Sequence, residues 1–347
     1  MSREQTTTQV LAKIFIGLVA AGIALVGVAF AGDPERHSVI AYLQYLPYLV
    51  YLLPVVVAVC SSISLGWRWR LLAGAALLLV LTEIMGLSIG RPDDGAGHIR
   101  FMTYNAKASF ALEDPQGLGK LAQEIMANDP DVLVMQDAGE FMALKMQRPE
   151  AFAALVGKRE VYGYGQYIVA SRLPIRDCAP GFIPFRDQHH SFVHCVLTAH
   201  GKDIDLVTVH FLTPRNGLNA VRHEGARGLD EWRINMTDRL MQSSELAQQL
   251  AQMKRPRIVA GDLNAPERSN VVKNLLSTGL RDAFSSAGFG YGFTHGHSLK
   301  PGLSFLRIDH ILVSDDIGVV DAYAGGKKGS QHRPVIADLR VNRERDD

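Results

Sequence analysis

The amino-acid composition changes abruptly near residue 91, and this break constrains the fold more than any other feature of the chain. Three apolar stretches precede it: Ile14–Ala31, Val39–Leu65 and Leu71–Ile89. A helix needs about 20 mostly apolar residues to cross the hydrocarbon core of a bilayer. The sequence therefore predicts a membrane anchor of three transmembrane helices over residues 1–90, followed by a polar C-terminal domain.

Basic residues beside these stretches predict how the anchor is oriented. Arg3 and Lys13 precede the first stretch, and Arg68 and Arg70 lie between the second and the third. Because short cytoplasmic loops are enriched in Lys and Arg, we expect the N-terminus in the cytoplasm and the C-terminal domain outside the cell (inner) membrane.

Two further features of this region bear on its topology. The first stretch ends in Ala29-Phe30-Ala31, which also fits a signal-peptide cleavage site. Cleavage after Ala31 would leave the predicted orientation unchanged. Residues 91–98 contain Pro, Gly and acidic residues and predict a linker that spans at most about 28 Å, so the domain would stay near the bilayer.

From residue 99 onward, short apolar strands alternate with helical and loop segments. Apolar residues at three- and four-residue spacing predict helices over Gly117–Asn128 and Arg239–Gln252. There are more strands than a doubly wound sheet with simple helical crossovers would need. We therefore expect an α/β fold of two mixed sheets packed face to face and flanked by helices, a four-layer sandwich over residues 99–347. The predicted strands are Ile99–Tyr104, Val132–Met135, Tyr167–Ala170, Phe192–Ala199, Asp205–Val209, Arg257–Ala260, Ile308–Val313 and Val335–Val341.

Polar residues stand at the ends of six of these strands. One such residue after a strand is usually a cap or a turn residue. Six strands that each deliver Asn, Asp or His to one edge instead indicate a ligand site, because such sites form where loops leave strand ends. The residues are Asn105, Asp137, His210, Asp262 with Asn264, Asp309 and His332.

The ordered motifs around these residues resemble the endonuclease/exonuclease/phosphatase superfamily over about residues 98–342. The three predicted N-terminal helices are similar to those of a membrane-anchored bacterial branch, some members of which are linked to glycopeptide antibiotic resistance. The motifs are Thr103-Tyr104-Asn105, Gln136-Asp137, Ser171-Arg172-Leu173-Pro174-Ile175, Val209-His210-Phe211, Gly261-Asp262-Leu263-Asn264, Arg307-Ile308-Asp309-His310 and Ser330-Gln331-His332-Arg333-Pro334-Val335.

The resemblance implies a divalent-metal-dependent phosphoester hydrolase. Oxygen ligands suit Mg²⁺ or Mn²⁺, and Asn105 and Asp137 are the expected metal ligands. Asp262 would orient or deprotonate the attacking water, with Asn264 helping to position the water and the phosphate. His332, held by Asp309, would contact the phosphate oxygens, as carboxylate–histidine pairs allow. His210 would support the charge that develops near the leaving group.

Two positions depart from the family pattern. The metal-binding acid after Gln is usually Glu, but here it is the shorter Asp137, and Glu140 three residues on could compensate. The residue before the last His is usually Asp, but here it is Gln331. Both changes remove reach or charge from the metal site.

The overall charge helps to choose among functions. The chain has 36 Lys and Arg against 35 Asp and Glu, so it lacks the basic footprint of a general nucleic-acid binder. We therefore favour a phosphate ester bound to the membrane, such as a lipid phosphate, as substrate. A metal-dependent nuclease and a non-catalytic binding domain on the membrane are the alternatives; the choice of monoester or diester, one or two metals, and the oligomeric state stay open.

Three cysteines do not make a disulfide framework. Cys178 and Cys195 could face each other on neighbouring strands, but two unpaired core thiols are the favoured interpretation. His295 and His297 lie in a Gly-rich loop that could line the substrate entrance. The polar segment Thr213–Asp238 could be a lid, a headgroup-contacting loop or a solvated surface loop.

Overall fold

The computed structural model describes residues 3–341 except 96, 98, 187, 300 and 301. Positions 96 and 98 of the predicted linker, and the last six residues of the predicted catalytic domain, therefore lie outside the described residues. The chain divides into two compact units. One consists of Met1–Leu87 with Arg268–Asn270, and the other of Ser88–Glu267 with Val271–Asp347.

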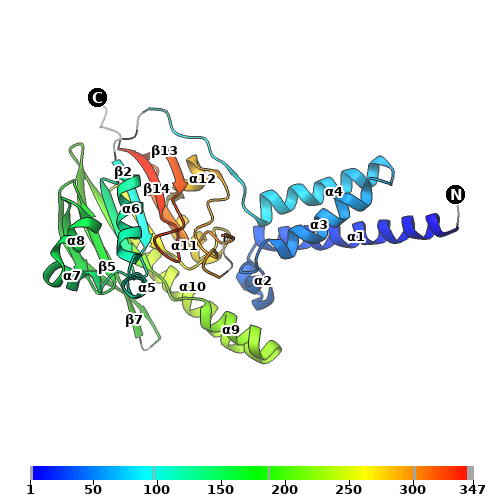
Figure 1. The fold of residues 1–347 in the computed structure, drawn as a ribbon, viewed down its shortest axis with the longest axis horizontal. Coiled ribbons are helices and arrows are strands. Elements are labelled where there is room, and N and C mark those ends of the chain that lie inside the picture. Colours follow the sequence, from blue (N-terminus) through cyan, green and yellow to red (C-terminus); the bar gives the residue numbers. More distant parts are fainter. Residues whose placement is uncertain (1–2, 96, 98, 187, 300–301, 342–347) are drawn as a thin grey trace. The chain divides into compact units, whose positions relative to one another are not determined.

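The first unit is helical. Its core is small and apolar: Ile16 of the first helix packs with Ala58 and Ala73 of two later helices and with Leu65 of the loop between them. The elements are α1 (Arg3–Ala31), the 3-10 helix η1 (Pro34–Arg36), α2 (Ser38–Leu43), α3 (Leu49–Ser62), α4 (Trp67–Leu79) and the π-helix η2 (Val80–Ile84) (Figure 1).

The prediction of three transmembrane helices is wrong. Among the described residues, only Thr7–Ala31 of α1 forms a helix that is long and apolar enough to cross a membrane, with a mean hydropathy of 2.6. The second apolar stretch breaks between Leu43 and Leu49 around Pro47, which cannot donate a helical hydrogen bond. The remaining α3 has 14 residues and spans about 21 Å, short of the hydrocarbon core. One N-terminal apolar helix thus remains as a candidate membrane anchor or signal sequence.

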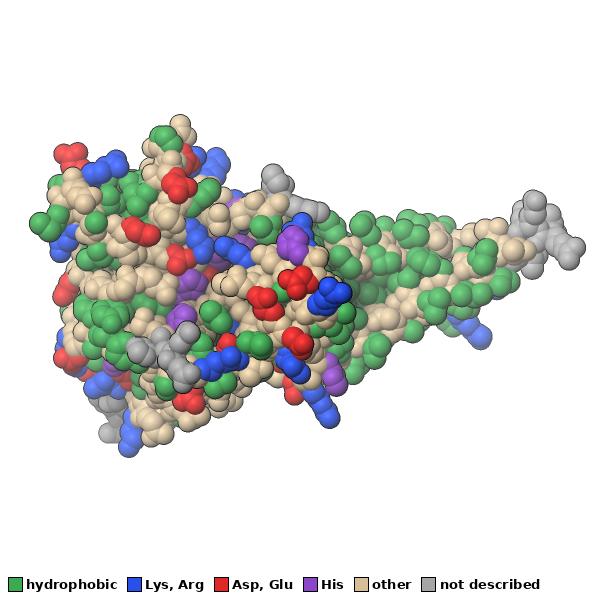
Figure 2. All heavy atoms as spheres, turned by 90° about the horizontal axis from the view of Figure 1, so that it is seen from below, with side chains coloured by type: hydrophobic (Ala, Val, Ile, Leu, Met, Phe, Trp, Pro, Cys, Tyr) green, Lys and Arg blue, Asp and Glu red, His purple; other side chains and the backbone are tan. Residues whose placement is uncertain are grey.

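The helices of this unit expose large apolar side chains. Leu18, Leu25 and Val28 of α1 are 69–73% exposed, and Leu53 and Val57 of α3 are more than half exposed. Figure 2 shows hydrophobic side chains along the helices that lead toward the N-terminus. A helix that is apolar on nearly every side is typical of a membrane environment or of a large protein core.

The second unit contains two mixed sheets, as predicted, and each has six strands. The first sheet has the order β13-β14-β2-β3-β5-β4 and the second has the order β10-β12-β9-β8-β7-β6. The strands of the first are β2 (Ile99–Asn105), β3 (Val132–Gln136), β4 (Glu160–Tyr164), β5 (Tyr167–Ser171), β13 (Ile317–Ala324) and β14 (Val335–Val341). The strands of the second are β6 (Ile175–Phe185), β7 (Gln188–Ala199), β8 (Lys202–His210), β9 (Arg257–Asp262), β10 (Leu280–Asp282) and β12 (Asp309–Ser314). A short pair joins β1 (Ser88–Ile89) to β11 (Phe289–Gly290).

Period-two alternation explains the four layers. Inward residues such as Phe101 and Val134 of one sheet and Leu206 and Ile258 of the other form the central core. Outward residues of the first sheet pack on α5 (Ala108–Glu113), α6 (Gly117–Asn128), α7 (Phe141–Gln147) and α8 (Pro149–Val156). Outward residues of the second sheet pack on α10 (Leu229–Gln252) and α11 (Asn270–Leu276). The short helix α12 (Ala283–Ala287) contributes Phe284 to the central core.

The segment Thr213–Asp238 differs from its predicted loop conformation. It forms α9 (Arg215–Glu224), the 3-10 helix η3 (Gly225–Gly228) and the first turns of α10. Trp232 is fully buried, and its ring lies 5.5 Å from the Arg239 guanidinium carbon. Burying an aromatic side chain of this size orders the segment, so it is part of the folded domain and not a solvated loop.

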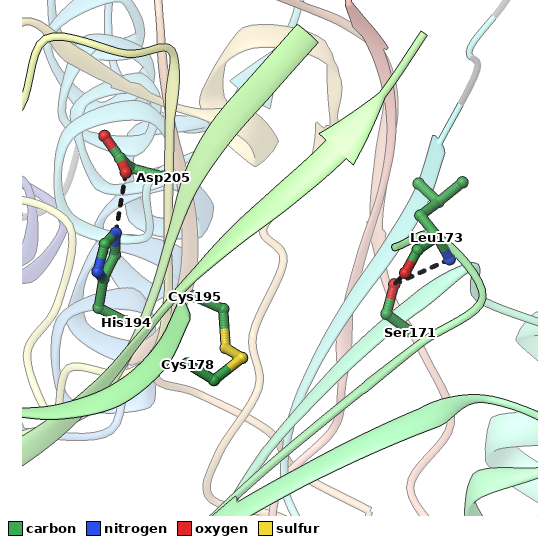
Figure 3. The surroundings of a disulfide bond; sticks show 6 residues. All are labelled: Ser171, Leu173, Cys178, His194, Cys195 and Asp205. Atoms are coloured by element: carbon green, nitrogen blue, oxygen red, sulfur yellow. Dashed lines mark hydrogen bonds and ion pairs between the residues drawn. A yellow bond between two sulfur atoms is a disulfide. The ribbon is translucent and has the colours of Figure 1, made fainter. Parts of the chain in front are cut away.

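The prediction of two unpaired core thiols is also wrong. Cys178 and Cys195 form a disulfide between β6 and β7, with their Cα atoms 4.1 Å apart (Figure 3). A register shift between Arg176 and Ala179 of β6 brings Cys178 opposite Cys195. The hydrophobic pattern of β6 does not reveal this register shift, because a β-bulge inserts one extra residue of any type into a strand.

Candidate functional site

The two sheets deliver their polar residues to a common edge. β2 is parallel to β3, which aligns Asn105 with Gln136, and β8 is parallel to β9, which aligns His210 with Asp262. The antiparallel β12 begins at the same edge, where Asp309 pairs with Asp262. All seven predicted site residues are therefore brought to one region of the domain, because the ends of parallel strands meet at one edge of a sheet.

Asp262 is the centre of this cluster. Its side chain is 1% exposed, and its Oδ2 accepts a hydrogen bond of 2.9 Å from Asn105 Nδ2. His210 Nε2 lies 3.4 Å and His332 Nε2 lies 3.8 Å from the same oxygen. One carboxylate oxygen thus faces three polar side chains that come from three different segments.

The last residues of β9 and the loop that follows them fix the direction of this carboxylate. Gly261 has φ 153°, and a Cβ there would lie 1.8 Å from the Val209 carbonyl oxygen, so only glycine fits. Asn264 adopts the left-handed conformation at φ 50°, and its backbone N–H donates to Asp262 Oδ1 over 2.8 Å. Its side-chain amide donates to the Phe211 carbonyl. Asp262 Oδ1 therefore holds the loop, while Oδ2 faces the cluster.

Asp309 and His332 form a buried pair. The His332 Nδ1 atom lies 2.9 Å and 3.2 Å from the two Asp309 oxygens, and both side chains are at most 3% exposed. Burial raises the pKa of Asp309 to about 7 and lowers the pKa of His332 to about 4. A proton shared between the two groups keeps the imidazole oriented, with Nε2 toward Asp262.

Asp137 and His210 close the other side of the site. The His210 Nδ1 atom lies 2.6 Å from Gln166 Oε1 and 3.5 Å from Asp137 Oδ1. Lys107 Nζ forms an ion pair with Asp137 Oδ2. Burial raises the pKa of Asp137, but the neighbouring His210 and Lys107 outweigh burial and hold the pKa of this carboxyl below its usual value.

Among the residues that the structure describes, two groups of side chains could hold a divalent cation. Asp262, Asp309 and His332 offer ligand atoms within 4.8 Å of one another, but Asp309 and His332 already satisfy each other. Asp137 and Asn105 offer only oxygen donors, and Asp137 already has a cation beside it in the ammonium of Lys107. A hard cation with oxygen ligands fits this second group better.

A cavity of about 660 Å³ opens beside Asp137. Lys107 and Arg215 contribute positive charge to its wall, and Phe110 contributes an aromatic ring. Glu140 and Gln331 also line it, so both positions that depart from the family pattern face the same space. The cavity has the size of a pocket for a small polar molecule.

Several contacts of the site were not predicted. Lys107 was missed because a lysine after a strand is usually a surface residue, and Gln166 because it lies in the tight turn between β4 and β5.

The segment before β12 also contacts the site. Thr294 Oγ1 accepts hydrogen bonds from the backbone N–H groups of Ile308 and Asp309. His295 was expected at the substrate entrance, and its ring centroid lies 4.7 Å from that of His332.

Gln136 links the two sheets by hydrogen bonds. Its amide nitrogen donates to Thr103 Oγ1 over 3.1 Å and to Thr208 Oγ1 over 2.9 Å. Thr103 and Thr208 belong to different sheets, so Gln136 connects the sheets below the site. This contact explains a polar residue at a fully buried strand position.

Residues 102–332 match the model of the family described as Endonuclease/Exonuclease/phosphatase family. These residues include every predicted site residue. Comparison with curated proteins gives no match.

Solved structures share the fold at low sequence identity. A protein of the same family description from Bacteroides thetaiotaomicron is 16% identical, with a TM-score of 0.54 over 72% of this chain and 100% of that one. A mannosyl-6-phosphatase from Bacteroides thetaiotaomicron VPI-5482 is 17% identical, with a TM-score of 0.52 over 70% and 100%. Truncated TDP2 from Caenorhabditis elegans is 16% identical, with a TM-score of 0.51 over 70% and 97%.

Proposed function

Because the chain belongs to the endonuclease/exonuclease/phosphatase family, we propose that it is a divalent-metal-dependent phosphoester hydrolase centred on Asp262. The main support is the position of one oxygen: Asp262 Oδ2 faces the side chains of Asn105, His210 and His332. Hydrolysis of a phosphate ester needs a water aligned with the leaving oxygen and groups that stabilise negative charge. The cluster supplies candidates for each need.

Asp262 orients the attacking water and accepts its proton. Its Oδ1 is engaged by the loop, so Oδ2 is the oxygen that can accept a hydrogen bond from water. Asn105 donates to that oxygen and keeps it in place. A carboxylate held at both oxygens loses little freedom when the water binds, which is the benefit of a preorganised site.

His332 contacts the phosphate oxygens through Nε2. Asp309 engages Nδ1 and fixes the ring, so Nε2 faces the space beside Asp262. His210 lies on the opposite side, where Gln166 orients its ring, and it supports charge near the leaving oxygen. Asn264 is held by the Phe211 carbonyl and helps to position the phosphate and the water.

Asp137 and Asn105 would hold the divalent cation. When bound, Mg²⁺ or Mn²⁺ would neutralise phosphate charge and polarise the phosphorus–oxygen bonds. The Asn105 Oδ1 atom accepts a 3.2 Å hydrogen bond from the Lys107 backbone N–H, which aims this oxygen toward the Lys107 and Asp137 side of the site. Gln331 lines the neighbouring cavity and can contribute a neutral oxygen.

We further propose that α1 anchors the protein in a membrane and that the catalytic domain lies outside the cytoplasm. Exposed leucine and valine side chains on α1 support the anchor. The Cys178–Cys195 disulfide supports an oxidising compartment, where such bonds form and persist. Arg3 and Lys13 precede the apolar part of α1, which favours a cytoplasmic N-terminus for a single span.

A phosphate ester at the membrane surface suits this location. The substrate would be a lipid-linked phosphate or another membrane-associated ester whose polar group enters the cavity beside Asp137. The near balance of 36 basic and 35 acidic residues gives no general attraction to nucleic acid.

The experiment compares substrates with the full chain in detergent. Phosphate or alcohol release is measured with Mg²⁺ and with Mn²⁺ on phosphatidic acid, a polyprenyl phosphate, a soluble sugar phosphate and single- and double-stranded DNA. The His332→Ala variant, purified in the same way, reports any contaminating hydrolase. Metal-dependent release from a lipid phosphate that is lost in His332→Ala supports the proposal. Cleavage of DNA alone overturns the substrate, and no turnover of any ester overturns the hydrolase.

A further inference from the structure

Lys107 has an unusual position for a lysine. It follows β2 by two residues and adopts the left-handed conformation at φ 46°. Its side chain is only 21% exposed and forms an ion pair with Asp137, which is 29% exposed. A non-glycine residue in this backbone region is uncommon, and such residues cluster at functional sites.

The charge of Lys107 acts on the whole cluster. It contributes to the low pKa of Asp137, and it adds to the effect of burial in lowering the pKa of His295 and His332. The ion pair with Asp137 places the ammonium group within the site, where it supplies positive charge, although the strand-end pattern of Asn, Asp and His did not include it.

The ion pair affects the expected metal ligands directly. Asp137 supplies the one negative charge of the two expected metal ligands, and its Oδ2 already forms an ion pair with Lys107. Asp137 Oδ1 faces His210 at 3.5 Å. A divalent cation that binds Asp137 must therefore displace the ammonium group or share the carboxylate with a like charge, and both cost free energy.

The displaced side chain has a place to go. Lys107 lines the cavity of about 660 Å³ together with Arg215 and Gln331. Lysine binds phosphate as a flexible point charge, so a small movement toward the cavity would let it contact a phosphate oxygen.

We propose that Lys107 occupies the cation position at Asp137 until a divalent metal displaces it, and that the displaced ammonium group then binds the phosphate of the substrate. Metal and lysine thus compete in the free protein and act together once phosphate is bound. The first half concerns metal binding alone, and only the second half rests on the proposed hydrolase function.

The test measures metal binding without turnover. Mn²⁺ is titrated into the full chain in detergent by calorimetry, with wild type, Lys107→Met, Lys107→Gln and Lys107→Arg. Lys120→Met is the matched control, because Lys120 forms a similar ion pair with Asp114, of 2.7 Å, on α6. Circular dichroism verifies that each variant is folded, and the two neutral variants give independent readings.

Removal of the competing charge strengthens metal binding. We expect Lys107→Met and Lys107→Gln to bind Mn²⁺ about two- to fivefold more tightly than wild type, from the usual strength of a partly exposed ion pair. Lys107→Arg keeps the charge and Lys120→Met lies elsewhere, so both should match wild type. Unchanged or weaker Mn²⁺ binding in the two neutral variants would overturn the competition.

A second titration tests the phosphate contact. Inorganic phosphate is added to protein saturated with Mn²⁺, where competition for Asp137 no longer contributes. We expect the neutral variants to bind phosphate about tenfold more weakly than wild type and Lys120→Met, as loss of one charge-assisted hydrogen bond implies. Equal phosphate affinity would overturn this half. A protein that hydrolyses none of the tested esters would contradict the proposed function while leaving the Mn²⁺ result to decide the competition.

Discussion

Asn105 and Asp262 belong to different sheets, yet the Asn105 side-chain amide donates a 2.9 Å hydrogen bond to Asp262 Oδ2. Both side chains are buried at the edge where the sheets meet. The loop that follows β9 holds Oδ1, but Oδ2 receives the hydrogen bond from Asn105 only when the two sheets are packed together. Packing of the two sheets therefore also forms this contact of the site.

The Asn105→Ala substitution tests this connection. It leaves a buried carboxylate without its partner, so we expect the free energy of unfolding to fall by about 1–3 kcal/mol. Urea denaturation followed by circular dichroism measures the change. Asn274→Ala is the control, since Asn274 donates a similar 2.9 Å hydrogen bond to Ser243 from a less buried position. An Asn105 variant that loses no more stability than the Asn274 variant would contradict the role given to this contact.

Much of this arrangement could be predicted from sequence. The strands that lead to Asn105, Asp137, His210 and Asp262 are rich in apolar residues, and each ends in or just before a polar site residue. Apolar runs of this kind predict buried strands whatever the overall topology. The polar residues converge because parallel strands share an edge, so the geometry follows from the strand assignments.

The unpredicted elements have weaker local signals. β6 carries Pro180, Gly181 and Pro184, and mostly exposed or half-buried residues fill its middle. Its partner β7 imposes the extended conformation through long-range pairing. β-propensity depends on such context, so a strand of this kind cannot be read from its own residues.

The site residues that were missed share one cause. Lys107 and Gln166 belong to connections, where composition alone does not distinguish a surface side chain from one that turns inward. Arg239 was placed only at the start of a predicted helix, but it is fully buried and donates to the Asn264 carbonyl over 3.2 Å. Each acquires its role from a segment far away in the chain.

The disulfide should stabilise the second unit. We expect the Cys178→Ser/Cys195→Ser double variant to lose about 2–4 kcal/mol of unfolding free energy, the usual effect of a native cross-link. The thermal midpoint of the wild type should fall in dithiothreitol, and that of the double variant should not respond. A wild-type midpoint that is the same with and without reductant would contradict a disulfide in the folded protein.

The anchor prediction concerns the exposed leucines of α1. Leu18 and Leu25 are 69% and 70% exposed, and a charge near the middle of a membrane helix costs about 2.5–3.5 kcal/mol. The Leu18→Lys/Leu25→Lys variant should therefore leave the carbonate-resistant membrane fraction of expressing cells. Leu112→Lys on α5 is the control, because Leu112 is also exposed but lies in the catalytic domain. Retention of the double variant in the membrane would show that α1 is not the anchor.

The pH dependence of stability should reflect His295. Burial, with the nearby His332, lowers the pKa of His295 to about 3, below its value in the unfolded chain of about 6.5. The folded state therefore favours the neutral ring. The resulting stability is present above pH 6.5 and is lost as the pH falls toward 3.

His295→Gln removes this titration and keeps a neutral polar side chain. Its thermal midpoint should fall less than that of wild type between pH 7 and pH 4, although His332 still contributes to the slope. Differential scanning calorimetry at several pH values measures both. A variant whose midpoint falls as steeply as that of wild type would show that His295 is protonated in the folded protein without penalty.

The rate of phosphoester hydrolysis by Asp262→Asn measures what this carboxylate contributes to the reaction. The amide keeps the size of the side chain and its contact with the Asn264 backbone but cannot accept a proton from water. We expect kcat/KM to fall about 10²- to 10⁴-fold, the usual effect of removing a general base. Mn²⁺ binding should stay close to wild type, and the free energy of unfolding should fall by about as much as in Asn105→Ala, because the new amide nitrogen cannot accept the hydrogen bond from Asn105. Asp203→Asn, on the exposed hairpin between β7 and β8, should keep full activity. Equal activity of wild type and Asp262→Asn would contradict a phosphoester hydrolase in which Asp262 accepts the proton of water.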